Sequence, residues 1–395
     1  MPSITVVAGS YEGCLVGYEV QLPQEGEEAC SATQILAMPA HSGCIRAMAC
    51  GGPLLATGGS DSAVGVFNLR TRREQGRLLQ QEGGRSLNCL RFYSSTHMIS
   101  AGDDGELCIW RTSDWECLTQ MRGHRAAVYD VDIHPSGRLA LSVAADAKLM
   151  LWNLLTGKCI YTSALDAPSR MVRWAPDGKS YAVGAKTAVL LFELGGSGAA
   201  RALPHERAAP LSLAFVGDAL LVSGGADAAL RVWKTDSGSR LCSHANAHAS
   251  RVKALEAVAP HFVVSASSDG ELKIWRVRAD TTRLAPLLTL STSLRLTTIG
   301  VCTPHTKPAD RGAAQAATHA APAPAASKGD APAPAGARGA GAARAKPKAK
   351  RAREAVDDGA ARAVRASGAV AKRRVGKATE GKAKRSAQRR AGSSS

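Results

Sequence analysis

The stretch RGHRAAVYDVDIHPSGRLALSVAADAKLMLWNLLTGKCIYTSAL (residues 122–165) reads as four short β-strands in succession. Apolar and polar residues alternate in VYDVDIHP, whereas LALSVAAD is more continuously apolar, as expected of a buried strand. KLMLWNL and KCIYTSAL follow, and the turn signals Pro135-Ser136-Gly137 and Thr156-Gly157 separate neighbouring strands. The segment therefore predicts one four-stranded sheet with its last strand on the outside.

Segments of this kind recur along the chain, each with a marker residue six positions before an aromatic one. The six plain copies and a weaker N-terminal one are Asp61 to Phe67, Asp104 to Trp110, Asp146 to Trp152, Lys186 to Phe192, Asp227 to Trp233, Asp269 to Trp275 and Glu12 to Tyr18. The plain copies start 43, 42, 40, 41 and 42 residues apart. A period of about 40–45 residues is typical of a β-propeller with four strands per blade. We therefore predict an all-β, seven-bladed propeller over residues 1–302.

The N-terminal copy is one strand short, because only ITVVAGS is available as a strand before Glu12. The far end of the repeat region offers two further strands. LLTLS (residues 287–291) can complete the last blade, and RLTTIGV (residues 295–301) can be the innermost strand of the first blade. Because such pairing leaves no open edge at the seam, we predict a ring closed by its N- and C-terminal strands. We expect this propeller to be a monomer within a larger assembly.

Polar residues at fixed offsets predict an internal framework for the blades. In WD40 propellers, which this repeat resembles, a His, a Ser or Thr, an Asp and a Trp of one blade form a hydrogen-bonded chain. Such a chain satisfies buried polar groups and fixes the geometry of the blade. Three blades carry the full set: His124, Ser142, Asp146 and Trp152; His205, Ser223, Asp227 and Trp233; His248, Ser265, Asp269 and Trp275. We interpret these residues as structural, because a catalytic triad occurs once and a framework recurs.

The other four blades carry incomplete sets. They hold His41, Thr57, Asp61 and Phe67; Ser100, Asp104 and Trp110; Ala182, Lys186 and Phe192; and Ala8, Glu12 and Tyr18. Phe67 lacks the indole donor, and the blade of Trp110 lacks the His. The blade around Lys186 is either a relaxed repeat or a partner surface, and the sequence leaves both interpretations open.

Motifs for other chemistry are weak. Gly178-Lys179-Ser180 resembles the end of a phosphate-binding loop, but Arg173 stands where that motif needs Gly, and a turn explains the segment better. His41, Cys44 and Cys50 match no usual zinc spacing. We therefore expect no catalytic residue, no bound metal and no cofactor, and we predict that the protein is not an enzyme.

The ten cysteines and the N-terminus indicate a soluble protein of a reducing compartment. The cysteines form no C-x-x-C pair, and the N-terminal stretch has no basic segment of the kind that begins a signal peptide. No apolar run approaches the ~18 residues of a membrane span, so we expect no membrane partner.

Charge divides the chain into two parts. Residues 301–395 hold 21 Lys and Arg against 6 Asp and Glu, a net charge of +15, while residues 1–300 carry +2. Residues 303–395 have no Phe, Trp or Tyr and are rich in Ala, Pro and Gly, so we predict a disordered basic tail. Its short basic clusters are typical of nuclear targeting or of RNA contact through phosphates, with a plain solvated tail as the alternative. The clusters contain Lys346, Lys348, Lys350, Arg351, Arg353, Lys372, Arg373, Arg374, Lys382, Lys384 and Arg385.

Three segments carry a more specific resemblance. CLRFYSSTHMISAGDDGELCIWRTSDWECL (residues 89–118), HPSGRLALSVAADAKLMLWNLLTGK (residues 134–158) and RVKALEAVAPHFVVSASSDGELKIWRV (residues 251–277) are similar to the p21-activated-kinase-interacting-protein-like family. VAGSYEGCLVGYEV and RLTTIGV resemble its two ends, so the resemblance spans about residues 5–302.

The resemblance implies two roles. The first is a nucleolar scaffold in assembly of the large ribosomal subunit and in maturation of its rRNA, with pre-ribosomal proteins and rRNA as partners. The second is an adaptor that binds a p21-activated kinase and restrains its activation. The basic tail favours the nucleus and nucleolus, with a nuclear import receptor as a further partner. A chromatin or ubiquitin-ligase scaffold is a third reading, since fold alone does not fix function.

Overall fold

The computed structural model describes residues 3–23, 30–79, 86–194, 200–206, 208–258, 261–278, 280 and 283–303. The basic clusters of the tail lie outside these residues. The described residues form strands only, paired antiparallel in seven four-stranded sheets. The predicted all-β propeller with seven blades is thereby confirmed.

The sheets are numbered as blades along the ring, and each is given from its innermost strand outward. Blades 1 to 3 are made of β28 (Leu296–Cys302), β1 (Ser3–Ser10), β2 (Cys14–Gln21) and β3 (Ser31–Pro39); β4 (Ile45–Gly51), β5 (Leu54–Gly59), β6 (Ala63–Asn68) and β7 (Arg73–Leu79); β8 (Leu87–Tyr93), β9 (His97–Gly102), β10 (Glu106–Arg111) and β11 (Glu116–Arg122). Blades 4 and 5 are made of β12 (Val128–Ile133), β13 (Leu139–Ala144), β14 (Lys148–Asn153) and β15 (Lys158–Ala164); β16 (Val172–Trp174), β17 (Ser180–Gly184), β18 (Ala188–Glu193) and β19 (Arg201–Pro204). Blades 6 and 7 are made of β20 (Pro210–Val216), β21 (Leu220–Gly225), β22 (Leu230–Lys234) and β23 (Arg240–His244); β24 (Val252–Val258), β25 (Phe262–Ser267), β26 (Glu271–Arg276) and β27 (Pro286–Ser291).

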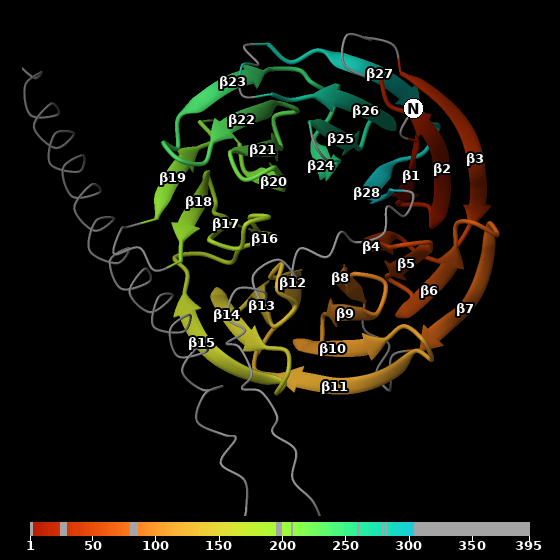
Figure 1. Cartoon of the computed structure of the whole chain (residues 1–395), viewed down its shortest axis with the longest axis vertical. Helices are drawn as coiled ribbons and strands as arrows, with labels where there is room; N and C mark the ends of the chain where they lie inside the picture. The colour runs from red at the N-terminus through yellow and green to blue at the C-terminus, as the bar shows by residue number, and fades with distance from the viewer. Residues whose placement is uncertain are drawn as a thin grey trace, which may run out of the picture. The chain divides into compact units, whose positions relative to one another are not determined.

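The ring closes in blade 1, as predicted. β28 pairs with β1 from Thr5 opposite Cys302 to Ser10 opposite Leu296, so strands from both ends of the propeller share one sheet. Figure 1 shows β28 beside β1, with the innermost strand of every blade around a central channel. Because the strand that follows blade 7 in the chain completes the sheet of blade 1, the ring has no open seam.

Packing between the blades follows the alternation of each strand. In β13 and β14 of blade 4, Ala140, Met150 and Trp152 pack toward blade 3. Leu141 and Leu151, from the same two strands, pack toward blade 5. Both faces of these strands are therefore apolar, which explains the continuous apolar runs that the sequence shows at the centre of each repeat.

One cysteine pair differs from the expectation of reduced thiols. Cys50 at the end of β4 and Cys302 at the end of β28 form a disulfide across a sequence separation of 252 residues, while the other eight cysteines are free. Ring closure places β28 in blade 1 beside β4 of blade 2, and the two Cα atoms lie 5.6 Å apart. The spacing of cysteines along the chain could not reveal this pair, because neither is near the other in sequence.

Candidate functional site

Blade 4 contains the complete four-residue framework. Nδ1 of His124 lies 3.1 Å from both carboxylate oxygens of Asp146, and Nε2 lies 2.7 Å from Ser142 Oγ. Trp152 donates its indole N–H to the same hydroxyl oxygen at 2.8 Å. A ring protonated on Nδ1 satisfies every member, because Ser142 then donates to Nε2 and accepts from the indole. Burial lowers the pKa of His124, which favours this neutral ring.

Blades 2 and 3 keep parts of the framework. His41 Nδ1 lies 2.8 Å from Asp61 Oδ1, and Nε2 lies 2.8 Å from Thr57 Oγ1, with the apolar Phe67 in the Trp position. In blade 3, Trp110 donates to Ser100 at 2.8 Å. Asp104 accepts the backbone N–H of Glu106 in the turn.

Blade 6 departs from the predicted chain, because Arg231 lies between His205 and Asp227. His205 Nε2 is 2.8 Å from Ser223 Oγ, and Trp233 donates to that oxygen at 2.8 Å. Nδ1 of His205 faces Arg231 Nη1 at 3.4 Å, and the guanidinium pairs with Asp227 at 2.5 Å. A guanidinium only donates, so His205 must carry its proton on Nε2, opposite to His124. Burial and then the charge of Arg231 lower the pKa of His205 to about 4.

Blade 7 places Lys273 at the position that Arg231 has in blade 6. His248 Nε2 lies 2.7 Å from Ser265 Oγ, and Trp275 donates to the same oxygen. Nδ1 of His248 is 3.5 Å from Asp269. Burial is the main cause that lowers the pKa of His248 to about 4.

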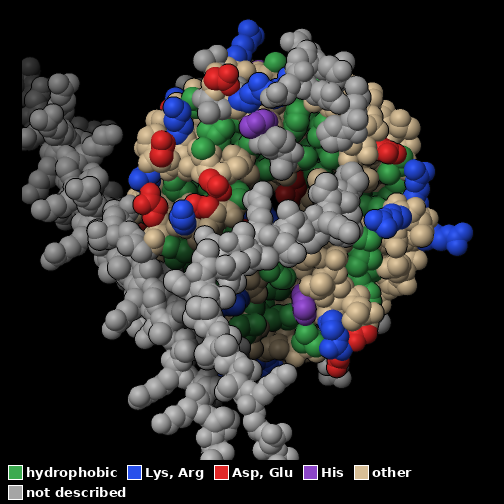
Figure 2. All heavy atoms as spheres, in the orientation of Figure 1, with side chains coloured by type: hydrophobic (Ala, Val, Ile, Leu, Met, Phe, Trp, Pro, Cys, Tyr) green, Lys and Arg blue, Asp and Glu red, His purple; other side chains and the backbone are tan. Residues whose placement is uncertain are grey.

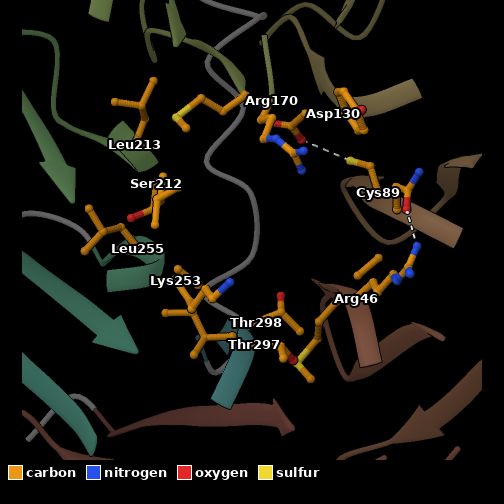
Figure 3. A pocket seen from close by; sticks show the side chains of 18 of the residues that line it. Arg46, Cys89, Asp130, Arg170, Ser212, Leu213, Lys253, Leu255, Thr297 and Thr298 are labelled. Atoms are coloured by element: carbon orange, nitrogen blue, oxygen red, sulfur yellow. Dashed lines mark hydrogen bonds between the residues drawn. The ribbon is translucent and has the colours of Figure 1, made fainter. Parts of the chain in front are cut away.

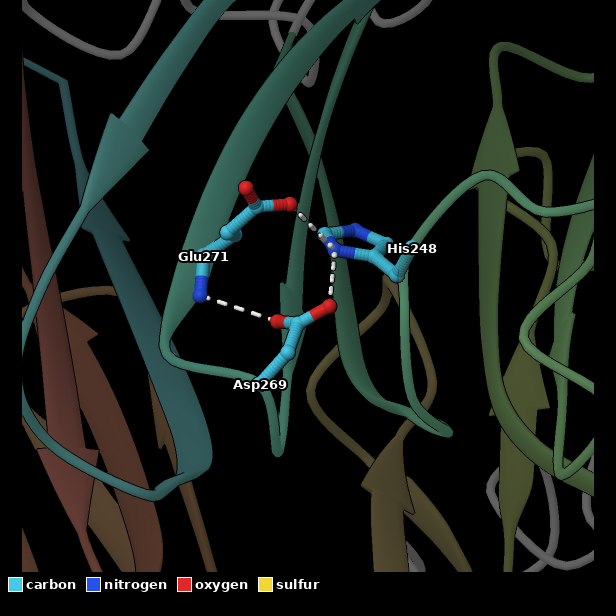
Figure 4. Close-up of side chains that lie close together, drawn as sticks. All are labelled: His248, Asp269 and Glu271. Atoms are coloured by element: carbon cyan, nitrogen blue, oxygen red, sulfur yellow. Dashed lines mark hydrogen bonds and ion pairs between the residues drawn. The ribbon is translucent and has the colours of Figure 1, made fainter.

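The same blade holds the one set of described side chains with the spacing of a metal site. One ligand atom each from His248, Asp269 and Glu271 lies within 4.8 Å of the others, and Figure 4 shows the three side chains converging. The ammonium of Lys273 is 2.9 Å from Glu271, and the backbone N–H of Ala249 donates to Asp269 at 2.8 Å. Because a lysine cation already holds the glutamate, the set does not fit a metal ion, and we interpret it as framework.

The strand register of blade 5 differs from the one predicted for the repeat around Lys186. The sequence offset puts Ala182 in the Ser position, but Val183 stands there, opposite Val172 and Leu190, as Ser142 stands opposite Val131 and Met150. The turn after β17 is one residue shorter than in blade 4 and closes with Ala185 N–H donating to Ala188. The shorter turn removes the Asp position and shifts the register by one residue, so Ala182 faces blade 6 instead.

An aromatic cluster fills the space of the missing framework. The rings of Tyr181 and Phe192 stack with centroids 4.9 Å apart, and Trp174 meets Tyr181 edge-on at 5.3 Å. His134 from blade 4 approaches Trp174 at 4.8 Å and contacts the carbonyl of Gly178 at 3.1 Å. Gly178 has a φ of 70°, and a Cβ there would lie 2.4 Å from His134. The glycine serves this turn and inter-blade contact, as the turn interpretation of residues 178–180 requires.

The geometry also argues against a zinc ion held by His41, Cys44 and Cys50. His41 is bonded within blade 2, and Cys50 is bonded to Cys302, so neither is aimed at a common ion with Cys44.

The central channel contains a belt of charged residues that the sequence analysis missed. Four innermost strands have a charged residue at the same position. It directly follows the residue that pairs with the Ser position of the framework. These charged residues are Arg91, Asp132, Arg173 and Glu256. Arg91 lies 3.5 Å from Asp132 and 3.5 Å from Glu256, which links blade 3 to blade 7 across the channel. Arg173 pairs with Asp130. Burial raises the pKa of Asp132 despite these cations.

The signal for this belt was present in the repeat. Charged residues in the middle of an innermost strand are unusual, and aligning the first strands of the blades would have placed these four at one level. A cavity of about 160 Å³, drawn in Figure 3, is lined in part by the belt residues Arg91, Arg173 and Glu256. On the face drawn in Figure 2, both Lys or Arg and Asp or Glu side chains are visible near the rim. The channel is therefore the candidate site for a specific partner.

The comparisons with known proteins agree with this geometry. The WD domain, G-beta repeat family matches residues 76–111 and 115–153, so the protein is a WD-repeat propeller, a fold that generally serves as a non-enzymatic scaffold. Among curated proteins, p21-activated protein kinase-interacting protein 1-like of Xenopus laevis is 33% identical over 76% of this chain and 83% of its own length. The human p21-activated protein kinase-interacting protein 1 is 29% identical over 75% of this chain and 76% of its own. Protein MAK11 of Saccharomyces cerevisiae is 29% identical over 48% and 51%.

The chain therefore belongs to the p21-activated protein kinase-interacting protein 1-like family of WD-repeat proteins. Among the described residues, no helix is long and apolar enough to cross a membrane.

Proposed function

We propose that the protein is a non-enzymatic scaffold in nucleolar assembly of the large ribosomal subunit and in maturation of its rRNA. The main support for the proposal is the uneven distribution of charge between the propeller and the tail. The family that the chain resembles implies the same role. A propeller region with a net charge of +2 is joined to a tail with +15. A strongly basic tail suits an RNA-rich assembly, because it binds phosphates without reading sequence.

The propeller supports the proposal by its rigidity. Framework histidines are buried in blades 2, 4, 6 and 7, and the ion belt holds the innermost strands together across the channel. Such a ring offers fixed surfaces for several proteins at once. The tail clusters then supply nuclear import and retention, with the import receptor and rRNA as their partners.

The test is affinity purification of the tagged full chain at moderate salt, with identification of the bound proteins and RNA. We expect precursors of the large subunit and their proteins. A matched variant with Lys372, Arg373 and Arg374 replaced by Ala should show reduced nuclear accumulation while its propeller melts at the same temperature. Recovery of a kinase without ribosomal material would overturn the proposal.

A second function is favoured by the names of the relatives. The frog and human proteins are named for interaction with p21-activated protein kinase, and a Schizosaccharomyces pombe relative, 23% identical, is named Shk1 kinase-binding protein 15. We propose binding and restraint of such a kinase as the alternative role. A pull-down of the purified full chain with a p21-activated kinase tests it directly, and retention equal to that of an unrelated WD propeller would argue against it.

A further inference from the structure

The mouth of the channel is formed by one equivalent residue from each blade. Six innermost strands contain a β-bulge just after their first residue. Bulges re-aim a side chain, and here the bulged residues line the cavity. They are Thr297, Arg46, Asn88, Tyr129, Leu211 and Lys253, and Arg170 has the same position before β16.

Two cations of this ring lack an anionic partner. Arg46 lies 3.7 Å from Asp103, but no carboxylate of the described residues forms an ion pair with Arg170 or Lys253. Burial, followed by the charges of Arg251, Arg295 and Arg170, lowers the pKa of Lys253. The mouth therefore concentrates positive charge without neutralising it, which favours binding of an anion.

The deeper belt does not share this imbalance. Arg91 and Arg173 are paired with Asp130, Asp132 and Glu256. An incoming anion thus meets unpaired cations at the mouth and neutralised ones below it. Figure 3 shows Arg46, Arg170 and Lys253 on different sides of the opening.

We propose that the channel mouth docks an acidic peptide segment of a protein partner, with a Glu or Asp side chain held between Arg170 and Lys253. The cavity of about 160 Å³ suits a single side chain. A separate hollow of about 590 Å³ between blades 6 and 7 is lined by Arg251, Asn246 and Asp227, whose carboxylate is paired with Arg231. Arg251 lies two residues before Lys253 in the chain, so we place the rest of the peptide there. This docking goes beyond the proposed function and does not depend on which assembly the partner belongs to.

The aromatic residue at the mouth, Tyr129, favours peptide over single-stranded RNA. The guanidinium of Arg170 lies 4.7 Å from its ring centroid. Sequence-tolerant RNA grooves combine cations with open aromatic faces on which bases stack. Here Arg170 covers one face of Tyr129, so the site attracts anions and stacks bases poorly.

The test measures binding of a fluorescein-labelled peptide of alternating Glu and Ser to the full chain by fluorescence anisotropy. The variant carries Arg170→Gln and Lys253→Gln. The matched control carries Arg138→Gln and Lys158→Gln, the same charge change at the opposite end of blade 4, where both side chains are exposed. All three proteins have the same basic tail, so background binding to it cancels.

We expect about tenfold weaker peptide binding by the mouth variant and a change below about twofold in the control. A charge-keeping pair, Arg170→Lys with Lys253→Arg, should retain binding, and melting temperatures show whether each variant is folded. Equal losses in the mouth variant and the control would overturn the proposal. So would an equal or larger loss for an oligouridylate probe, which would assign the mouth to RNA.

Discussion

Blades 4 and 5 are neighbouring sheets that are stabilised at equivalent positions by different kinds of interaction. Blade 4 uses a polar chain from His124 through Ser142 to Trp152, and every bond of it lies within one blade. Blade 5 puts Val183 in the Ser position and uses stacked rings, which reach into blade 4 through His134. A blade without the polar framework therefore need not contain a void at that position, because closely packed apolar side chains can fill it.

The difference teaches where each blade is vulnerable. A polar chain depends on direction and protonation, since each donor needs its acceptor. An aromatic cluster depends on contact area and shape. Substitutions and pH should therefore affect the two blades in different ways.

The largest effect is expected from opening the ring on which both blades depend. Deleting residues 292–302 removes Leu296 and Ile299, which are 0% and 2% exposed, and leaves β1 unpaired. We expect a loss of about 5 kcal/mol or more in unfolding free energy, because each buried aliphatic side chain contributes ~1.5–3 kcal/mol. Thermal melts in reducing buffer check this without any contribution from the Cys50–Cys302 disulfide. Removal of residues 385–395 is the control of equal length, and identical melting temperatures for the two truncations would contradict the closure.

The second-largest effect is expected from a substitution in the aromatic cluster of blade 5. Tyr181→Ala removes the ring between Trp174 and Phe192, and we expect a loss of ~3–5 kcal/mol from the cavity and the lost contacts. Denaturant melts of the full chain measure it, with Tyr181→Phe as the control that keeps both ring contacts. A loss below about 1 kcal/mol would show that the cluster does not support blade 5.

We expect the free energy of unfolding to depend on pH through the buried histidines of the polar blades. The pKa of His205 is about 4 in the folded protein, below the ordinary value of 6.5, so the unfolded chain binds the proton more readily. The stabilisation is complete above about pH 6.5 and is lost as the pH falls toward 4, by ~2 kcal/mol at about pH 5. Melts across this range should show the fall, and His205→Gln should reduce it by about that amount, leaving the share of His248, whose pKa is also about 4. Tyr181→Phe in blade 5 alters no group that titrates there, so a flattened profile in that variant would refute the assignment.

The sequence predicted the parts of the molecule that recur and missed those that depend on register or on distant contacts. Seven blades followed from the spacing of aromatic residues, because each blade repeats the same constraint, and the closing strand followed from the strand that the N-terminal copy lacks. Arg231 was overlooked because it inserts between two residues that match the pattern. Ala182 was wrongly assigned to the Ser position, which Val183 occupies, because a turn shorter by one residue moves the register without changing the apolar pattern. The ion belt and the channel mouth join residues of different blades, so only an alignment of the innermost strands of all repeats could have indicated them.

The smallest effects come from exchanging one aromatic residue in each blade. Trp152→Phe removes the indole donor to Ser142, and we expect a loss of about 1 kcal/mol for the missing hydrogen bond. Phe192→Trp adds a donor to blade 5, where Val183 offers no acceptor. We expect this change to destabilise the protein by ~1–3 kcal/mol, because a buried N–H without a partner keeps its desolvation penalty.

Denaturant melts of the two variants and of the combination Phe192→Trp with Val183→Ser decide the comparison. If the polar chain and the aromatic stack are alternative solutions for one position, the added Ser should recover part of the loss in blade 5, since its hydroxyl then accepts the indole N–H. Stabilisation by Phe192→Trp alone would mean that ring size, and not the hydrogen bond, sets the preference at this position in every blade.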